Sequence, residues 1–61
     1  GPFQMLDALG PTRVIEKIEA GGGALPKMLS VLKDAGAETF YRNDGAEFLG
    51  RDGNYHQTPP E

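Results

Sequence analysis

The side chains of this 61-residue chain that are suited to chemistry are few and far apart. His56 is the only histidine, and a general base needs an orienting partner and a substrate within reach. A zinc site needs several ligands, but the chain has no cysteine and no second histidine. Ser30 falls within a helical pattern and has no nucleophile elbow around it. We therefore expect His56 to be a solvated surface residue, and nucleophilic catalysis has no support.

Acidic residues near two Asp-Gly pairs resemble oxygen ligands for calcium. The spacing of a calcium-binding EF-hand loop is absent, and both pairs are explained as turns. Carboxylate pairs on this segment are explained more simply as salt-bridge partners than as an acid–base dyad. The sequence therefore predicts no catalytic residue, no metal site and no cofactor, and indicates that the chain is not an enzyme. The residues weighed here are Glu38, Asn43, Asp44, Glu47, Asp52 and Asn54.

Three consecutive glycines, Gly21-Gly22-Gly23, could be a phosphate-binding loop. A Walker loop continues with Gly-Lys-Ser/Thr at the start of the next helix, whereas Ala24-Leu25-Pro26 follows here. We interpret the glycines as a flexible joint between two helices.

Composition indicates one small globular domain. The chain is 38% hydrophobic and 25% charged, with a net charge of −3 and six basic residues that form no cluster. No apolar stretch approaches the ~20 residues of a membrane span. These features favour a soluble, cytoplasmic protein that does not enter a membrane. A domain this small is marginally stable alone, so a partner, homodimerisation or a larger parent protein all stay open.

The expected domain covers residues 3–56. Gly1-Pro2 resembles a protease-cleavage remnant and is left out of it, while residues 57–61 are expected to form a flexible tail. Residues 3–9 predict one helical turn, and helices are predicted over 11–20 and 26–35. In the second helix Leu25, Met28, Leu29 and Leu32 form one apolar stripe, and Gly36 suits a left-handed C-cap.

After Gly36 the hydrophobic period changes from 3.6 to 2, and Asp44-Gly45 predicts a type I′ β-hairpin. The turn fixes a register that brings opposite charges and aromatic residues together. Asp52-Gly53 repeats the signal, so a short third strand is expected with Tyr55 opposite Gly50. The fold class is α+β, with two short helices packed on an antiparallel hairpin or three-stranded meander. The predicted hairpin pairs are Asn43 with Ala46, Arg42 with Glu47, Tyr41 with Phe48, Phe40 with Leu49, Thr39 with Gly50, and Glu38 with Arg51.

The two faces of the hairpin cannot both pack on one layer of helices. The face with Tyr41 and Phe48 carries fewer charges, so we expect it to face the helices. Phe40 and Leu49 then form an exposed apolar pair with a polar rim, which is typical of a small interface. In the alternative, residues 3–9 cover this pair. The predicted partner-binding residues are Phe40, Leu49, Glu38, Arg42, Glu47 and Arg51.

Three functions are compatible with this pattern. The first is a protein-interaction or docking module that binds a protein or peptide through its hairpin face or strand edge. The second is a winged-helix-like nucleic-acid module with Lys27, Lys33, Arg42 and Arg51 as contacts, which the net acidity disfavours. The third is a small inhibitor of a host or partner enzyme.

Residues 24–61 resemble the β-hairpin docking domains of modular synthases. The resemblance rests on a leucine-rich helix, Gly36-Ala37, Phe48-Leu49-x-Arg51 and the sequence Thr58-Pro59-Pro60-Glu61. It implies a docking role, although the helix expected after the hairpin in that family is absent. We assign no family from it.

Overall fold

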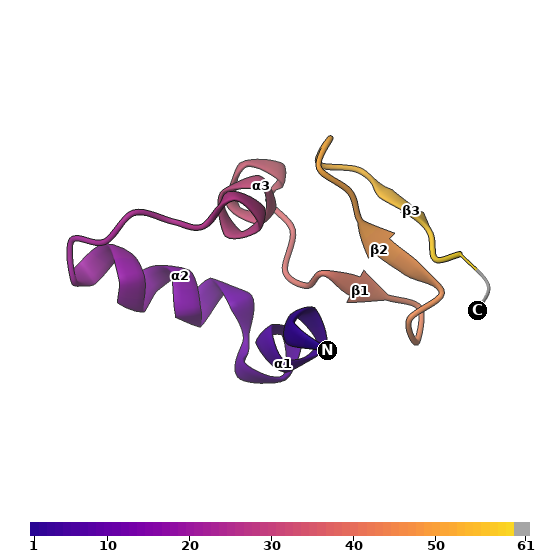
Figure 1. Cartoon of the computed structure of the whole chain (residues 1–61), viewed down its shortest axis with the longest axis horizontal. Coiled ribbons are helices and arrows are strands. Elements are labelled where there is room, and N and C mark those ends of the chain that lie inside the picture. The colour runs from indigo at the N-terminus through magenta and orange to yellow at the C-terminus, as the bar shows by residue number, and fades with distance from the viewer. Residues whose placement is uncertain (60–61) are drawn as a thin grey trace.

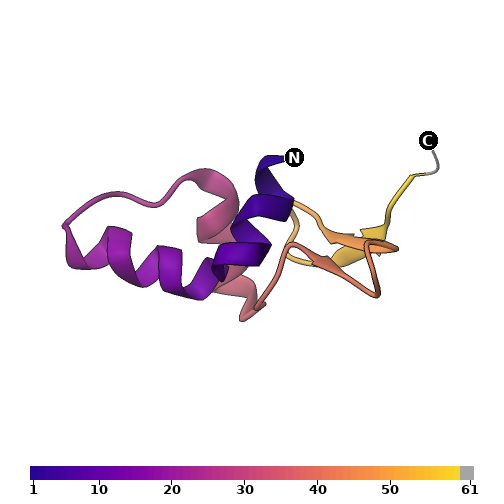
Figure 2. The same cartoon turned by 90° about the horizontal axis from the view of Figure 1, so that it is seen from below.

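The computed structural model describes residues 1–59 and shows three helices followed by a three-stranded antiparallel sheet. This confirms the predicted α+β class. Figure 1 shows α2 at one end of the molecule and the sheet at the other, with α1 and α3 between them. The view in Figure 2 shows the same elongated arrangement from below, and the molecule measures 38 × 22 × 16 Å. The helices are α1 (Pro2–Leu9), α2 (Pro11–Ala20) and α3 (Lys27–Ala35). The strands are β1 (Tyr41–Arg42), β2 (Glu47–Leu49) and β3 (Tyr55–Gln57), in the order β1-β2-β3.

Helix α1 is longer than the single turn predicted for residues 3–9. It has eight residues, and Pro2 is the first of them, so Pro2 belongs to the fold although it was left out of the expected domain. Proline suits this position because its missing N–H has no helical partner there. Gly10 then separates α1 from α2 with a φ of 88°, while its N–H donates to the Leu6 carbonyl at 2.9 Å. The chain thereby turns between two helices without an intervening loop.

The bounds of α2 are those predicted, and α3 begins one residue later than expected. Pro26 is the N-cap of α3, because its ψ of 153° is extended, and its carbonyl accepts the first helical hydrogen bond from Ser30 at 3.0 Å. Gly36 is in the predicted left-handed C-cap conformation, with φ 66° and ψ 23°. An ion pair of 2.6 Å between Lys33 and Glu19 joins α3 to α2.

The register of β1 and β2 is confirmed near the turn. Tyr41 pairs with Phe48 and Arg42 with Glu47, as predicted. Asp44 and Gly45 both have positive φ, as a type I′ turn requires. The ladder is shorter than predicted, since β1 begins at Tyr41 and β2 ends at Leu49. The predicted Thr39–Gly50 and Glu38–Arg51 pairs therefore do not form.

The register of β3 differs from the prediction by one residue. Tyr55 lies opposite Leu49 rather than Gly50, and the Gly50 N–H donates to the Asn54 carbonyl at 2.8 Å. The loop between β2 and β3 therefore has three residues instead of two. The Gly53 N–H donates to the Gly50 carbonyl and closes a turn, and Gly53 itself adopts a φ of 82°, as the last residue of such a loop requires. Tyr55 therefore shares a sheet face with Leu49.

The sheet extends into the segment that was predicted to be a flexible tail. Gln57 is the last residue of β3. The Thr58 N–H donates to the Ala46 carbonyl at 2.8 Å, and its hydroxyl donates to the Gly45 carbonyl at 2.7 Å. Gln57 is thus paired with Glu47 of β2, and Thr58 is anchored to the first hairpin turn. Of the predicted tail, residues 60 and 61 lie outside the described residues.

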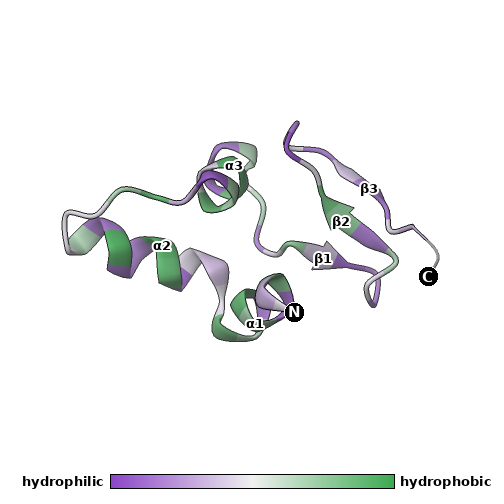
Figure 3. Cartoon of the chain, in the orientation of Figure 1, coloured by the Kyte–Doolittle hydropathy of each residue, from purple (hydrophilic) through white to green (hydrophobic). Residues whose placement is uncertain are grey.

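The core lies where α2, α3 and the hairpin meet. Figure 3 shows hydrophobic residues along the helices and in the middle of β2, whereas β3 is mostly hydrophilic. Burying one such large side chain stabilises a fold by roughly 1.5–3 kcal/mol. The buried hydrophobic residues are Ile15, Leu29, Val31, Leu32, Phe40 and Leu49.

Candidate functional site

The predicted partner-binding pair is not on the surface. Phe40 is 2% exposed and Leu49 is 3% exposed, so the prediction that they form an exposed apolar face is wrong. Helix α1 packs on Phe40, and the Phe3 and Phe40 ring centroids are 4.9 Å apart. For Phe40 this is the alternative arrangement, in which the N-terminal segment covers it, while Leu49 belongs to the same buried core cluster. Tyr41 and Phe48 are only half-buried.

The four charged residues predicted to surround that pair do not act as one rim. Arg42 and Glu47 form the expected ion pair at 3.0 Å. The Arg42 guanidinium also lies 3.9 Å from the centre of the Tyr55 ring, a cation–π contact that the sequence did not reveal. Among residues 1–59, no ion pair joins Glu38 to Arg51, because both lie outside the ladder. Arg51 lies instead in the turn that follows β2.

Asp7 joins α1 to the sheet, a role that the sequence analysis did not predict. Its carboxylate accepts hydrogen bonds from the Phe40 N–H at 2.7 Å and the Tyr41 N–H at 2.9 Å. Tyr41 is the first residue of the edge strand β1 and Phe40 is the residue before it, so the carboxylate holds the start of this strand. A single aspartate in an apolar helix was the only signal, and its partners lie more than thirty residues away.

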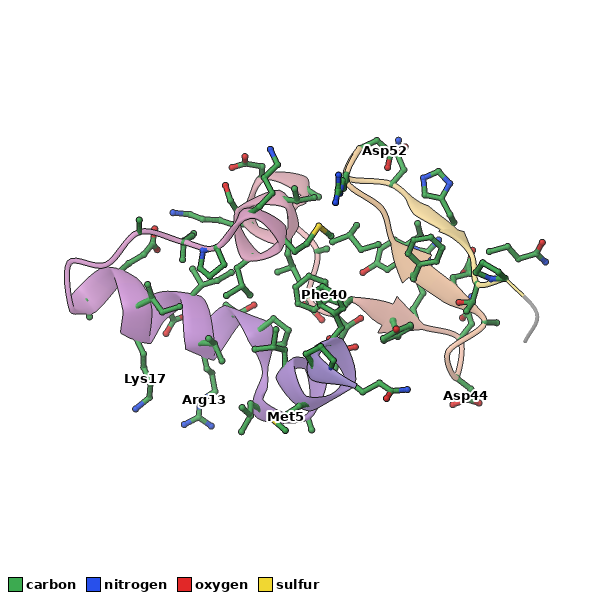
Figure 4. The ribbon with its side chains drawn as sticks, viewed as in Figure 1. Met5, Arg13, Lys17, Phe40, Asp44 and Asp52 are labelled. Carbon is green, nitrogen blue, oxygen red and sulfur yellow. The ribbon has the colours of Figure 1, made fainter. Side chains whose placement is uncertain are left out.

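A groove lies between α1, α3 and the hairpin. Its cavity volume is about 230 Å³, and its lining is mainly apolar. Figure 4 shows Phe40 in this central region, between the helices and the sheet. The one charged side chain of the lining belongs to Arg51, which is exposed. The lining residues are Phe3, Met28, Phe40, Tyr41, Phe48, Leu49, Gly50 and Arg51.

His56 and Asp52 form a surface pair beside this groove. The predicted surface position of His56 is confirmed, and its Nε2 lies 2.9 Å from Asp52 Oδ2. Gly50 makes room for the ring, since a Cβ there would lie 2.7 Å from a His56 ring carbon. A hydrogen bond from the Asn54 N–H, and next the one from His56, hold the pKa of Asp52 below its ordinary value of 3.8. No serine or threonine that could serve as a nucleophile contacts this pair among the hydrogen bonds of residues 1–59.

The outer surface of α1 is the second apolar feature. Met5 is 66% exposed and Leu9 is 59% exposed. Leu9 also lines a shallow hollow with Arg13, Val14 and Lys17 of α2. Figure 4 shows Met5, Arg13 and Lys17 along the same side of the molecule. We call Met5, Leu9 and Val14, with the bordering Arg13 and Lys17, the α1 outer surface.

The basic residues predicted to contact nucleic acid have acidic neighbours. Lys33 pairs with Glu19, whose hydrogen bond and charge raise the pKa of the lysine above 10.5. Arg42 pairs with Glu47. Lys27 and Arg51 line one polar hollow together with Asp34 and Asp52. This mixture of signs differs from the uninterrupted basic surface that follows a phosphate backbone.

Within residues 1–59, no three His, Cys, Asp or Glu side chains gather closely enough to bind a metal ion. The same residues contain no helix with the length and apolar character that crossing a membrane needs.

Fold and surface together define a small α+β domain with an apolar groove and a separate apolar helix surface. Over 56 residues the chain is 39% identical to the protein named probable 3-hydroxyacyl-CoA dehydrogenase from Bacillus subtilis (strain 168). The match covers 90% of this chain but only 7% of that relative, so the chain corresponds to a small part of its length. No family model matches the chain, and no solved structure matches it.

Proposed function

We propose that this chain is a non-catalytic docking module that packs against the remainder of a larger protein related to 3-hydroxyacyl-CoA dehydrogenases. The observation that carries the proposal is the α1 outer surface. Met5 and Leu9 extend from a helix whose opposite face packs on the core through Leu6 and Phe3. Large apolar side chains that remain exposed beside one another are typical of surfaces that a partner covers.

The similarity supports the choice of partner. Ninety per cent of this chain matches a stretch that makes up 7% of the Bacillus subtilis protein. A stretch of that size inside a much longer protein has neighbouring structure available to cover an apolar surface. Arg13 and Lys17 at the border favour a partner surface whose apolar centre has acidic groups beside it.

The side-chain chemistry supports a non-catalytic role. The one histidine pairs with Asp52 on the surface, and the hydrogen bonds of the described residues place no nucleophile beside it. Asp7, which is partly buried, is occupied with two backbone N–H groups of the sheet. In this proposal, any dehydrogenase chemistry belongs to other parts of the larger protein. The inhibitor and nucleic-acid alternatives have no observation in their favour.

The test is a chimera of the Bacillus subtilis relative in which the matched residues are replaced by those of this chain. The double variant Met5→Lys, Leu9→Lys should raise the rate at which a protease cleaves the inserted segment by about tenfold or more. The reason is that losing apolar contact worth roughly 1.5 kcal/mol makes local opening about tenfold more frequent.

Ala20→Lys is the control, because Ala20 is exposed at the end of α2 and is not part of the outer surface. Its cleavage rate should equal that of the unmodified chimera. Equal rates for the double variant and for Ala20→Lys would refute the proposed docking through this surface.

A further inference from the structure

The groove between α1, α3 and the hairpin is distinct from the α1 outer surface. It is formed by residues from three separate regions of the chain, with Phe3 at one side, Met28 at another and the half-buried Phe48 on the sheet. The fold itself therefore shapes it, and it does not depend on a single mobile loop.

The size of the groove limits what it can hold. At about 230 Å³ it falls below the roughly 300–1,000 Å³ that is usual for small-molecule and cofactor sites. It is instead of the order of one large side chain. Protein interfaces place such side chains in well-packed apolar pockets, where they contribute a large part of the binding energy.

The lining of the groove contains one charged side chain, which also borders a polar hollow shared with Asp34 and Asp52. Arg51 is the charged residue of the lining, and no ion pair within residues 1–59 involves it. Its neighbour Asp52 is already engaged by His56 and by the Asn54 N–H. A guanidinium in this position complements a carboxylate presented beside the apolar group that enters the groove.

We propose that the groove binds one large apolar side chain of a partner protein, next in sequence to an aspartate or glutamate that pairs with Arg51. This inference rests on the proposed docking function and specifies a second contact for it. The apolar side chain lies against Phe3, Met28 and Phe48, and the carboxylate lies at the end where Arg51 is exposed. The apolar side chain and the carboxylate belong to one segment of the partner protein, which is acidic next to Arg51.

The experiment is a selection of binding peptides from a random 12-residue library on the immobilised 61-residue chain. Peptides that bind should converge on Phe, Leu or Trp adjacent to Asp or Glu. Synthetic copies should bind the Arg51→Glu variant at least tenfold more weakly, and a selection on that variant should enrich Lys or Arg instead. Lys33→Glu makes the same charge change at an exposed residue of α3 that lines neither the groove nor the α1 outer surface, and it should leave the peptides' affinity unchanged.

Several outcomes would overturn the inference. One is a selection without enrichment, and another is enriched peptides that bind wild type and Arg51→Glu equally. Decanoate, added as a lipid probe, should not displace the peptides; displacement at micromolar concentration would assign the groove to an acyl chain.

The inference and the proposed docking function can fail separately. Peptides that lose affinity with Met5→Lys but not with Arg51→Glu would refute the groove and leave the α1 outer surface supported. Acidic–apolar peptides with the expected Arg51 dependence, together with a chimera insensitive to Met5 and Leu9, would support the groove and refute docking through α1.

Discussion

The two faces of α1 differ in how much of their chemistry the domain itself uses. On the inner face, Phe3 packs on Phe40 and the Asp7 carboxylate accepts two N–H groups of the sheet. On the outer face, Met5 and Leu9 extend from the same two turns with more than half of each residue exposed. Because both faces are apolar, sequence hydrophobicity alone does not separate them. The comparison teaches that α1 connects the core to a surface that another structure can cover.

The largest expected loss of stability comes from removing a core contact of the inner face of α1. Phe40→Ala removes a buried ring from the contact with Phe3 and should lower the free energy of unfolding by about 3–5 kcal/mol. In a domain of this size that is most or all of the stability. Urea denaturation followed by circular dichroism measures it. Phe48→Ala is the control, since Phe48 is only half-buried, and losses of equal size in both variants would contradict the inner-face account.

The second effect concerns the polar contact of the same face. Asp7→Ala leaves the Phe40 and Tyr41 N–H groups without their acceptor and should cost about 1–3 kcal/mol. Hydrogen exchange of these two amides should accelerate more than that of the amides within α3. Asp34→Ala removes an exposed carboxylate as the control. If the two amides exchange equally in wild type and in Asp7→Ala, the carboxylate does not secure the sheet edge.

These inner-face contacts mark the limit of what the sequence could reveal. The turn at Asp44-Gly45 and the pairs next to it were predictable because the turn and its cross-strand partners lie within a few residues. The burial of Phe40 was not, because it depends on where α1 packs. Asp7 was missed for the same reason, since nothing local connects it to Tyr41.

The candidate site was predictable only in part. The Arg42–Glu47 pair follows from the register and is present. The position of Tyr55 was misassigned because Asp52-Gly53 fits both a two-residue and a three-residue loop, and only packing decides between them. The exposure of Met5 and Leu9 was not predictable, because the apolar cluster of residues 3–9 gives no sign of which members stay outside the core.

A smaller effect on the free energy of unfolding is expected from Asp52, and it depends on pH. The pKa of Asp52 is lowered in the folded state, so this carboxylate stabilises the fold above its ordinary pKa of 3.8. That contribution is lost as the pH falls through the lower folded value. Urea denaturation of wild type and Asp52→Asn should therefore differ more at pH 7 than at pH 3. A difference that grows toward acidic pH would show that the direction of the shift is wrong.

The smallest expected effect is on the outer face in the isolated chain. Met5→Lys together with Leu9→Lys should change the free energy of unfolding by no more than about 0.5 kcal/mol, because neither side chain is buried. The same urea titration measures this. A loss above 2 kcal/mol would mean that the outer face contributes to the core, and the contrast between the two faces of α1 would disappear.

The most direct test of the central claim is the oxidation rate of Met5. Hydrogen peroxide converts accessible methionine to the sulfoxide, and mass spectrometry reads each methionine separately. In the isolated chain Met5 should oxidise faster than the half-buried Met28. In the chimera with the Bacillus subtilis relative, checked first for cooperative unfolding, we predict that Met5 oxidises at least about tenfold more slowly than in the isolated chain. An unchanged Met5 rate in the folded chimera would contradict the claim that the α1 outer surface is covered by the larger protein.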